Sequence, residues 1–220
     1  MYFPITNSGE GFKKLVFKIA HAIWESEDIP DQWDLTTLHM IFKSGLNDCM
    51  GSYRYIHLKD WFPRLFEGII FMKMKPKLII EMSKFQIGAK PSHRAQEHLF
   101  VLKSTMALYK MLSRPLLAQF VDIQKYFDRE DLMTAMDAIN EAGVKGKTYR
   151  LMYKMNSNTH IQVKTPVRIS DTATTGENIG QGSIPGAVAS ALNLDINVRK
   201  KFDTLKPVIW AYLLVEFQNK

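Results

Sequence analysis

Residues 116–131 read LLAQFVDIQKYFDRED, and this stretch decides how the rest of the chain is interpreted. An apolar run from Leu116 to Val121 ends on an acid, Asp122, and a second acid, Asp128, precedes a helix-forming segment. The run predicts a buried strand, and a carboxylate at a strand tip can place a metal ligand on rigid backbone with its oxygens in an open cleft. The alternative for Asp122 is an exposed aspartate that begins a turn. Asp128 is more simply explained as a helix N-cap.

The composition is that of a globular protein with a basic surface. Its 220 residues suffice for one large domain or two small subdomains. Hydrophobic residues make up 46% and charged residues 23%, which excludes a disordered chain. The 29 Lys+Arg against 22 Asp+Glu give a net charge of +7. This excess favours an anionic partner, with nucleic acid the first candidate, although a basic protein without such a partner is an open alternative.

The cysteine count and the N-terminus indicate the compartment. Cys49 is the only cysteine, so an internal disulfide is excluded and a reducing compartment fits. The N-terminal residues MYFPITNSGEGF lack the basic start and apolar core of a signal peptide. No apolar run approaches the roughly 20 residues of a membrane span. We therefore expect an intracellular protein, nuclear or cytoplasmic, that is not secreted and has no membrane partner; the sequence does not indicate an oligomeric state.

Hydrophobic periodicity predicts helices and strands that alternate along the chain. Their order lacks the regular βαβ spacing of a doubly wound sheet, so we predict an α+β fold. The helix over 93–112 carries apolar residues at three-four spacing and is expected to be amphipathic. Helices are expected over about 11–25, 61–80, 93–112, 132–139, 146–156 and 187–202, strands over 35–42, 53–58, 116–121 and 208–217, and a small hairpin over 159–169.

The segment FVDIQKYFD, residues 120–128, resembles the first catalytic motif, FxDxxKAFD, of reverse transcriptases from non-long-terminal-repeat (LINE-type) retrotransposons. The resemblance implies that Asp122 binds the two Mg²⁺ ions of the reaction. It also implies that Phe127 packs under the incoming sugar. Tyr126 stands where the family usually has Ala, and we expect it to crowd the nucleotide site.

Further stretches resemble the family in the order that it requires. SYRYIHL, residues 52–58, is similar to its YRxIxL fingers motif, which implies that Arg54 grips the incoming triphosphate, with help from Lys43 at the end of the preceding strand. A guanidinium suits this role because its planar, always charged fork matches phosphate oxygens. The other similar stretches are residues 29–45, 64–78, 85–99 and 138–163.

GENIGQGSIPGAVASALNLD, residues 176–195, resembles the second palm motif, RQGxPLSPxLFNLxL. Its glycines are not followed by the Lys of a Walker A loop. The resemblance implies that Gln181 and Gly182 contact the nucleotide and the templating base, and that the small Gly182 allows close backbone approach. Asn193 matches the helix Asn of the family, whereas Gly180 replaces its usual Arg.

The third palm motif of the family supplies two more aspartates, in the pattern YADD. The corresponding stretch here is WAYLLV, residues 210–215, where Tyr212 and Leu213 stand in place of the two acids. Two-metal phosphoryl transfer needs several carboxylates that converge on the ions. The sequence therefore predicts that Asp122 lacks its partners and that catalysis is impaired.

Taken as a whole, the resemblance implies the fingers and palm of a right-hand polymerase, with an N-terminal extension and fingers over 1–115, a palm over 116–220, and no thumb. It implies a Mg²⁺-dependent RNA-directed DNA polymerase that adds dNTPs to a DNA primer on an RNA template. One alternative is a non-catalytic RNA- or DNA-binding or scaffold protein of the same fold; another is a decayed fragment with no selected role. Phosphate contacts of a binding protein would come from Lys73, Lys75, Lys77, Lys145, Lys147, Arg150, Arg199, Lys200 and Lys201, whose alternative is a solvated surface.

Overall fold

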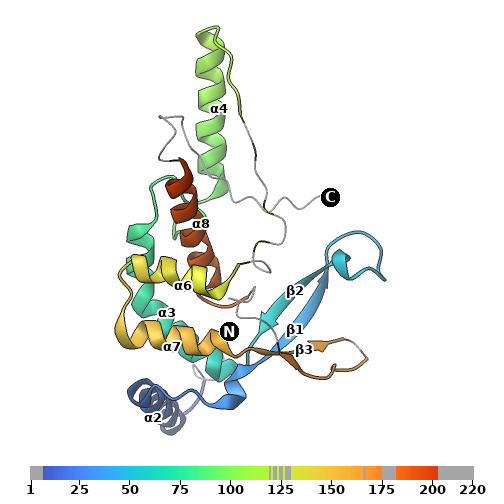
Figure 1. Cartoon of the computed structure of the whole chain (residues 1–220), viewed down its shortest axis with the longest axis vertical. Helices are drawn as coiled ribbons and strands as arrows, with labels where there is room; N and C mark the ends of the chain where they lie inside the picture. Colours follow the sequence, from blue (N-terminus) through green and yellow to red (C-terminus); the bar gives the residue numbers. More distant parts are fainter. Residues whose placement is uncertain are drawn as a thin grey trace.

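The computed structural model describes residues 7–118, 120, 123, 126, 130–165, 167–174 and 182–202. Six α-helices and a four-stranded mixed sheet have their bounds within these residues, which confirms the predicted α+β class. Most of the helices gather into one body, the sheet extends from one side of it, and the helix over Ala95–Met111 projects from its end (Figure 1). None of the helices in the described ranges combines the length and apolar character that a membrane span requires.

The helices follow the predicted periodicity closely. Each helix expected from the sequence is present, with limits that differ by a few residues because terminal turns are set by local capping. The helices are α2 (Glu10–Ser26), α3 (Trp61–Glu81), α4 (Ala95–Met111), α6 (Leu132–Glu141), α7 (Gly146–Ser157) and α8 (Gly186–Phe202).

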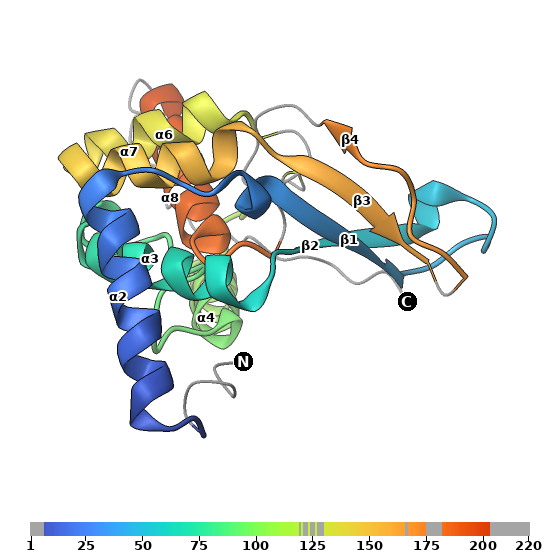
Figure 2. The ribbon, with the colours of Figure 1, turned by 90° about the horizontal axis from the view of Figure 1, so that it is seen from below.

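The sheet is built on the two strands that were predicted near the N-terminus, β1 (Leu35–Phe42) and β2 (Tyr53–Leu58). These strands form an antiparallel hairpin, and β3 (His160–Lys164) pairs in parallel with β1. β4 (Ala173–Thr174) adds to β3, so the strand order is β2-β1-β3-β4. The hairpin expected over 159–169 is present as an isolated bridge between Lys164 and Ile169, and its main pairing extends to β4. Figure 2 shows the sheet beside the helical body.

The core lies among α3, α6, α7 and α8. Along α3, fully or almost fully buried side chains recur every fourth residue at Phe66, Ile70, Met74 and Leu78, which form one stripe of the helix. α3 packs on α7 and α8, and α6 packs on both of them. Burial of each such side chain stabilises the fold by about 1.5–3 kcal/mol. This core fixes the relative positions of the elements that carry the candidate site.

The buried strand predicted over 116–121 is not observed. The described residues 116–118 and 120 have no strand structure, and Leu117 and Phe120 are 96% and 66% exposed. A strand needs hydrogen bonds to a neighbouring strand, and these described residues belong to no strand pair. The strand expected over 208–217 lies outside the described residues.

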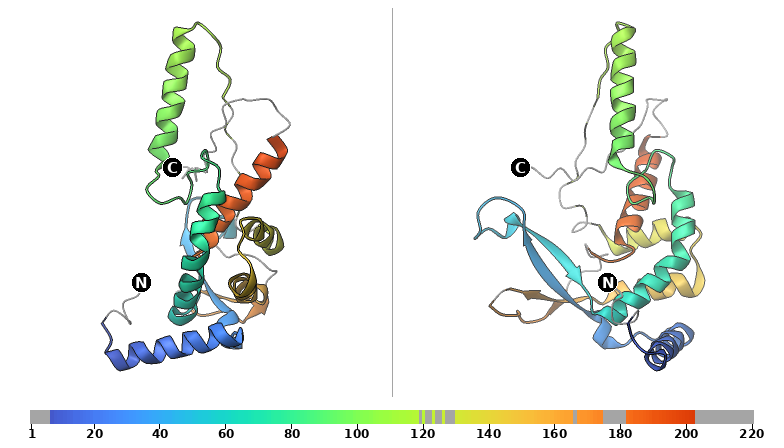
Figure 3. Two further views of the ribbon diagram at one scale, coloured as in Figure 1. Left: turned by 90° about the vertical axis from the view of Figure 1, so that its left-hand side faces the viewer. Right: turned by 180° about the vertical axis from the view of Figure 1, so that it is seen from behind.

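The helix α4 forms where it was predicted, but its apolar side chains are not buried. Leu99 and Met106 are 46% and 54% exposed, and His98 is the only buried residue of the helix. The helix projects from the helical body in the views of Figures 1 and 3, and most of its length meets no other described helix. The segment that follows α4 returns beside it and encloses a groove of about 350 Å³, lined by Leu102, Met106, Tyr109, Lys110, Arg114, Leu116, Ala118 and Phe120.

The N-cap of α6 also differs from the prediction. Asp131 directly precedes the helix, and its Oδ2 accepts a hydrogen bond of 3.0 Å from the backbone N–H of Thr134. This is the geometry of a capping carboxylate, which satisfies an N–H that has no partner within the helix. The capping role assigned to Asp128 therefore belongs to Asp131, and Asp128 lies outside the described residues.

Candidate functional site

Three of the predicted site residues are described, and all three lie on or against the β1–β2 hairpin: Lys43, Arg54 and Gly182. The remaining ones lie outside the described residues, namely Asp122, Phe127, Gln181, Tyr212 and Leu213.

Lys43 and Arg54 lie together near the turn of this hairpin. Arg54 is opposite Ile41 in the antiparallel register, and the backbone N–H of Lys43 donates to the carbonyl of Ser52 at 2.8 Å. The two cations are thus held at one end of the sheet by the ladder of backbone hydrogen bonds. Their closeness follows from the antiparallel pairing of the two strands, in which Phe42 is opposite Tyr53.

Gly182 lies directly against the middle of β2. Its φ of +109° is a conformation that other residues rarely adopt, and a Cβ at this position would lie 2.9 Å from the carbonyl oxygen of His57 and 3.1 Å from Cγ2 of Ile56. The close backbone approach expected of Gly182 is therefore an approach to β2 itself. Since side chains alternate along a strand, Ile56 and Arg54 share a face of the sheet. The fold thus places Gly182 against Ile56, which lies two residues from Arg54 along β2.

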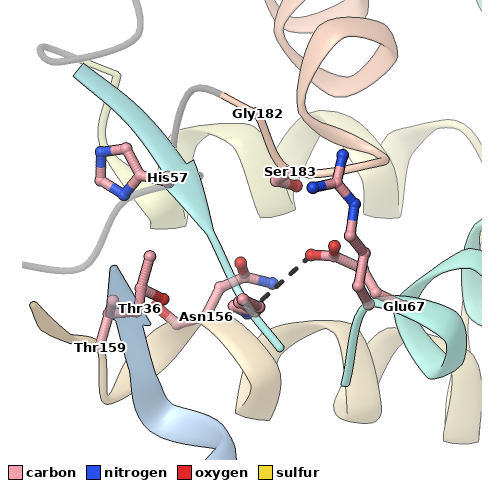
Figure 4. Close-up of a pocket in the computed structure, with 9 residues that line it drawn as sticks. Thr36, His57, Glu67, Asn156, Thr159, Gly182 and Ser183 are labelled. Atoms are coloured by element: carbon pink, nitrogen blue, oxygen red, sulfur yellow. Dashed lines mark hydrogen bonds and ion pairs between the residues drawn. The ribbon is translucent and has the colours of Figure 1, made fainter. Parts of the chain in front are cut away.

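A small cavity opens beside Gly182, where β1 and β2 meet the start of α3 and the end of α7 (Figure 4). Its volume is about 20 Å³, enough for one water molecule. Four lining residues each have a buried polar atom without a hydrogen-bond partner among the described residues: Oγ1 of Thr36, Nε of Arg64, Oε1 of Glu67 and Oγ of Ser183. Such a concentration of unpaired donors and acceptors is unusual in a protein interior and favours a small polar occupant.

Lys59 and Glu67 form a buried ion pair at this cavity. Nζ of Lys59 donates to the carbonyl of Met155 at 2.6 Å and lies 3.9 Å from Oε1 of Glu67. Burial lowers the pKa of Lys59, and the nearby carboxylates of Glu67 and Asp34 oppose this shift. Oε2 of Glu67 accepts from the backbone N–H of Ile184 at 3.3 Å. Glu67 therefore ties α3 to the segment that carries Gly182 onto β2.

A second buried carboxylate, which the sequence did not single out, lies between α6 and α8. Glu130 accepts hydrogen bonds from the hydroxyl of Tyr126 at 3.1 Å, from Nδ2 of Asn193 at 2.9 Å, and from Oγ of Ser190. Burial and the charge of Glu130 both raise the pKa of Tyr126. Tyr126, which was expected to crowd the nucleotide site, and Asn193, which matches the helix Asn of the family, both have structural partners here. No local sequence pattern marks Glu130, because two of its three partners, Ser190 and Asn193, lie about 60 residues away on α8.

Most of the cations expected to bind phosphate have partners within the chain. Arg150 donates two hydrogen bonds of 2.6 Å to Glu27, and this contact lowers the pKa of Glu27. The others bind carboxylates, carbonyls, an amide or aromatic rings: Lys73 over Trp24, Lys75 over Phe71, Lys77 with Gly143, Lys145 with Asn140, Lys147 with Glu25, Arg199 with Glu81 and Asp195, and Lys200 with Glu141. The side chain of Lys201 lies outside the described residues. This pairing favours the alternative of a solvated surface for these cations.

Comparison with protein-family models gave no match, and comparison with curated proteins gave no significant match. Within the described ranges, no group of three or more His, Cys, Asp or Glu side chains is arranged to hold a metal ion.

Proposed function

We propose that the chain is a reverse-transcriptase-like domain of the LINE type that binds nucleotide and nucleic acid and in which the polymerase centre is degenerate. The observation that carries the proposal is the position of Gly182 against Ile56 and His57 of β2, the strand that also carries Arg54. The resemblance assigned both residues to one nucleotide from separate motifs, and their closeness is a coincidence if those motifs are accidental. Arg54 would hold the triphosphate through charged hydrogen bonds, with Lys43 at the adjacent strand end.

In this proposal residues 1–115 contribute an N-terminal extension and fingers and residues 116–220 contribute a palm. The β1–β2 hairpin belongs to the fingers, and Gly182 belongs to the palm segment that contacts it. The contact between Gly182 and His57 would then mark the boundary at which a nucleotide binds between the two parts. The nucleic-acid partners of the chain in this proposal are an RNA template and a DNA primer, as in the family that it resembles.

The chemistry of the donor set argues against productive Mg²⁺ binding. Two-metal catalysis needs converging carboxylates, and Mg²⁺ prefers oxygen ligands. Of the three positions that correspond to the catalytic acids, only Asp122 has a carboxylate. Tyr212 offers a neutral phenol and Leu213 offers no ligand atom at all. The residues present therefore do not fit a pair of Mg²⁺ ions, and we propose that the chain does not extend primers.

Two measurements test this proposal. The first compares binding of a 2′-deoxynucleoside triphosphate by the wild type, Arg54→Ala and, as a control, Arg150→Ala, which removes an arginine that is paired with Glu27. We expect weaker binding for Arg54→Ala alone. Equal affinity in all three proteins would contradict the role of Arg54.

The second measurement concerns the degenerate positions. We expect no primer extension by the wild type, and a gain of Mn²⁺ affinity in Tyr212→Asp/Leu213→Asp that is abolished when Asp122→Asn is added. A double variant without any gain, or a gain that persists without Asp122, would contradict the proposed positions of the catalytic residues. Strong extension by the wild type would refute the degenerate centre.

The second candidate function is a non-catalytic RNA- or DNA-binding or scaffold protein of the same fold. It is favoured by Tyr212 and Leu213, which remove catalytic ligands but leave the proposed nucleotide face unchanged. Primer extension separates it from an active polymerase. Salt-dependent RNA binding separates it from a decayed fragment, because phosphate contacts release counterions and weaken steeply with salt.

A further inference from the structure

The small cavity beside Gly182 gathers most of the unsatisfied buried polar groups of the described residues. Six buried side-chain atoms of these residues have no hydrogen-bond partner, and four of the six line this cavity: Oγ1 of Thr36, Nε of Arg64, Oε1 of Glu67 and Oγ of Ser183. Thr36 and Glu67 are each 1% exposed, so bulk solvent does not reach their side chains. Buried polar atoms in proteins are paired with other protein groups or with ordered water. The four atoms therefore indicate an occupant of the cavity.

The volume of the cavity limits the occupant to one very small molecule. The cavity measures about 20 Å³. A bound water needs roughly 10–15 Å³ on this measure. A phosphate, a sugar or a base is several times larger and cannot enter. The occupant is therefore not the nucleotide that we assign to Arg54, nor any part of it.

The charges at the cavity determine the chemistry of the occupant. Oε1 of the ionised Glu67 can only accept a hydrogen bond, and Nε of Arg64 can only donate one. The hydroxyl groups of Thr36 and Ser183 can do either. The carboxylate of Glu67 would repel an anion, and the side chains of Lys59 and Arg64 would repel a cation. A neutral molecule that both donates and accepts hydrogen bonds fits these groups, and at this volume that molecule is water.

The geometry of the Lys59–Glu67 ion pair supports the same occupant. Nζ of Lys59 lies 3.9 Å from Oε1 of Glu67. This separation is too long for a hydrogen bond, but it allows one water molecule to contact both atoms. In Figure 4 the carboxylate of Glu67, on α3, lies across the cavity from Thr36, on β1. A water molecule that accepts from Lys59 and donates to Glu67 therefore completes this ion pair.

We propose that the cavity binds one water molecule that bridges Lys59 and Glu67 and joins β1, α3 and the segment that carries Gly182. Its remaining hydrogen bonds are to the polar groups of these three elements, since a buried water makes two to four such bonds. Oε2 of Glu67 accepts from the backbone N–H of Ile184 at 3.3 Å, so Glu67 and the water hold this segment together. The inference does not depend on the role that we propose for Arg54 in nucleotide binding.

Two measurements on the whole chain test for the bound water. Oxygen-17 relaxation dispersion counts the water molecules that a protein holds for longer than its tumbling time, and a crystal structure shows where they lie. The variant is Thr36→Ile, which replaces the hydroxyl group at the cavity by an ethyl group. The matched control is Thr37→Ile, which makes the same change at the next residue of β1, on the opposite face of the sheet. Far-UV circular dichroism and Tm establish that each variant is folded.

We expect crystals of the wild type to show one water within about 2.7–3.2 Å of both Oε1 of Glu67 and Nζ of Lys59. Thr36→Ile should hold one long-lived water fewer than the wild type, and Thr37→Ile should hold the same number. Wild-type crystals without this water overturn the inference, even if Thr36→Ile does not fold. Equal water counts in all three folded proteins overturn it as well. Wild-type crystals soaked in sodium bromide should show no anomalous peak in the cavity; a bromide peak there would identify an anion site instead.

The joining of the three elements has its own measurement, amide hydrogen exchange at Ile184, whose N–H donates to Glu67. We expect this amide to exchange roughly fivefold faster in Thr36→Ile than in the wild type, as for the loss of one net hydrogen bond from a local contact. Exchange in Thr37→Ile should match the wild type. Equal rates in all three proteins, or equal acceleration in both variants, would overturn the role of the water in holding this segment.

Discussion

Replacement of Gly182 by alanine isolates the contact on which the candidate site depends. The added Cβ would lie 2.9 Å from the carbonyl oxygen of His57, a separation that Cβ atoms essentially never show. The obstacle is backbone in a paired strand, so it cannot rotate away as a flexible side chain would. The φ of +109° adds strain, because an L side chain rarely occupies that region.

The loss in the free energy of unfolding has two parts, the backbone strain at Gly182 and the close contact with His57. A residue held in a sparsely populated backbone region costs about 1–3 kcal/mol. Overpacking against a rigid neighbour costs about 1–3 kcal/mol more. We therefore expect Gly182→Ala to lower the free energy of unfolding by roughly 2–6 kcal/mol in the absence of any ligand. For a chain of this size each kcal/mol lowers Tm by about 2–4 °C.

Urea denaturation followed by circular dichroism measures this loss, and Gly143→Ala is the matched control. Gly143 also has a positive φ, +80°, but an added Cβ would meet no atom within 4 Å. It should therefore cost only the backbone strain, and the difference between the two variants reports the contact with β2. Equal losses in Gly182→Ala and Gly143→Ala would refute the close packing of Gly182 on His57.

Three other perturbations address the capping residue and the buried carboxylate network. Asp131→Ala should lower the free energy of unfolding by about 1 kcal/mol through loss of the N-cap, whereas Asp131→Asn should retain most of it, as measured by urea denaturation. Tyr126 has a raised pKa in the folded protein, so the unfolded chain loses the tyrosine proton first, and this contribution to stability falls as pH rises above about 10. Thermal melts of Tyr126→Phe should show a weaker alkaline decline than the wild type. Glu130→Ala should cost about 2–4 kcal/mol, because it leaves buried donors without an acceptor.

The elements that could be predicted are those whose pattern is local. The helices α3, α6 and α8 bury the stripe that their spacing indicates, and β1 and β2 are joined by a connection short enough to make them neighbours. The resemblance grouped Lys43 and Arg54 at one triphosphate, and the pairing of β1 with β2 brings their backbones to the same end of the sheet. Local patterns suffice to predict these elements, although the helices on which α3 packs, α7 and α8, lie far along the chain.

The wrong predictions share a different cause. An apolar run indicates which side chains favour burial, but not which element buries them. Residues 116–118 and the apolar side chains of α4 have the composition of a strand and of an amphipathic helix, yet no described element packs against most of that surface. Asp128 and Asp131 are equally good capping residues by type, and only the observed start of α6 at Leu132 selects Asp131.

The candidate site was predictable only where a motif pointed to it. Nothing in the spacing of Gly182 and His57 indicates that they touch, and the cavity beside them draws its polar atoms from β1, α3 and the residues before α8. The pairing of Arg150 with Glu27 was equally hidden, because a charge count does not reveal which cations have a carboxylate beside them. Tertiary contacts between distant segments decided both questions.

The relation between Tyr126 and Glu130 bears on whether this chain is a decayed fragment. Burial of either side chain alone would cost free energy, because a buried hydroxyl or carboxylate without partners loses its hydration. Together they share a hydrogen bond of 3.1 Å, and Ser190 and Asn193 supply further donors to Glu130. If this network sustains the fold, Tyr126→Phe and Glu130→Ala should be non-additive, with a coupling of about 0.5–3 kcal/mol in a double-mutant cycle measured by urea denaturation. A control cycle that pairs Tyr126→Phe with Asp131→Asn should be additive, because that substitution keeps the cap and Asp131 has no part in the network. Additive losses in the first cycle would mean that Tyr126 and Glu130 act separately, and the replacement of the family's alanine by tyrosine would then be a departure without compensation, as expected of a sequence in decay.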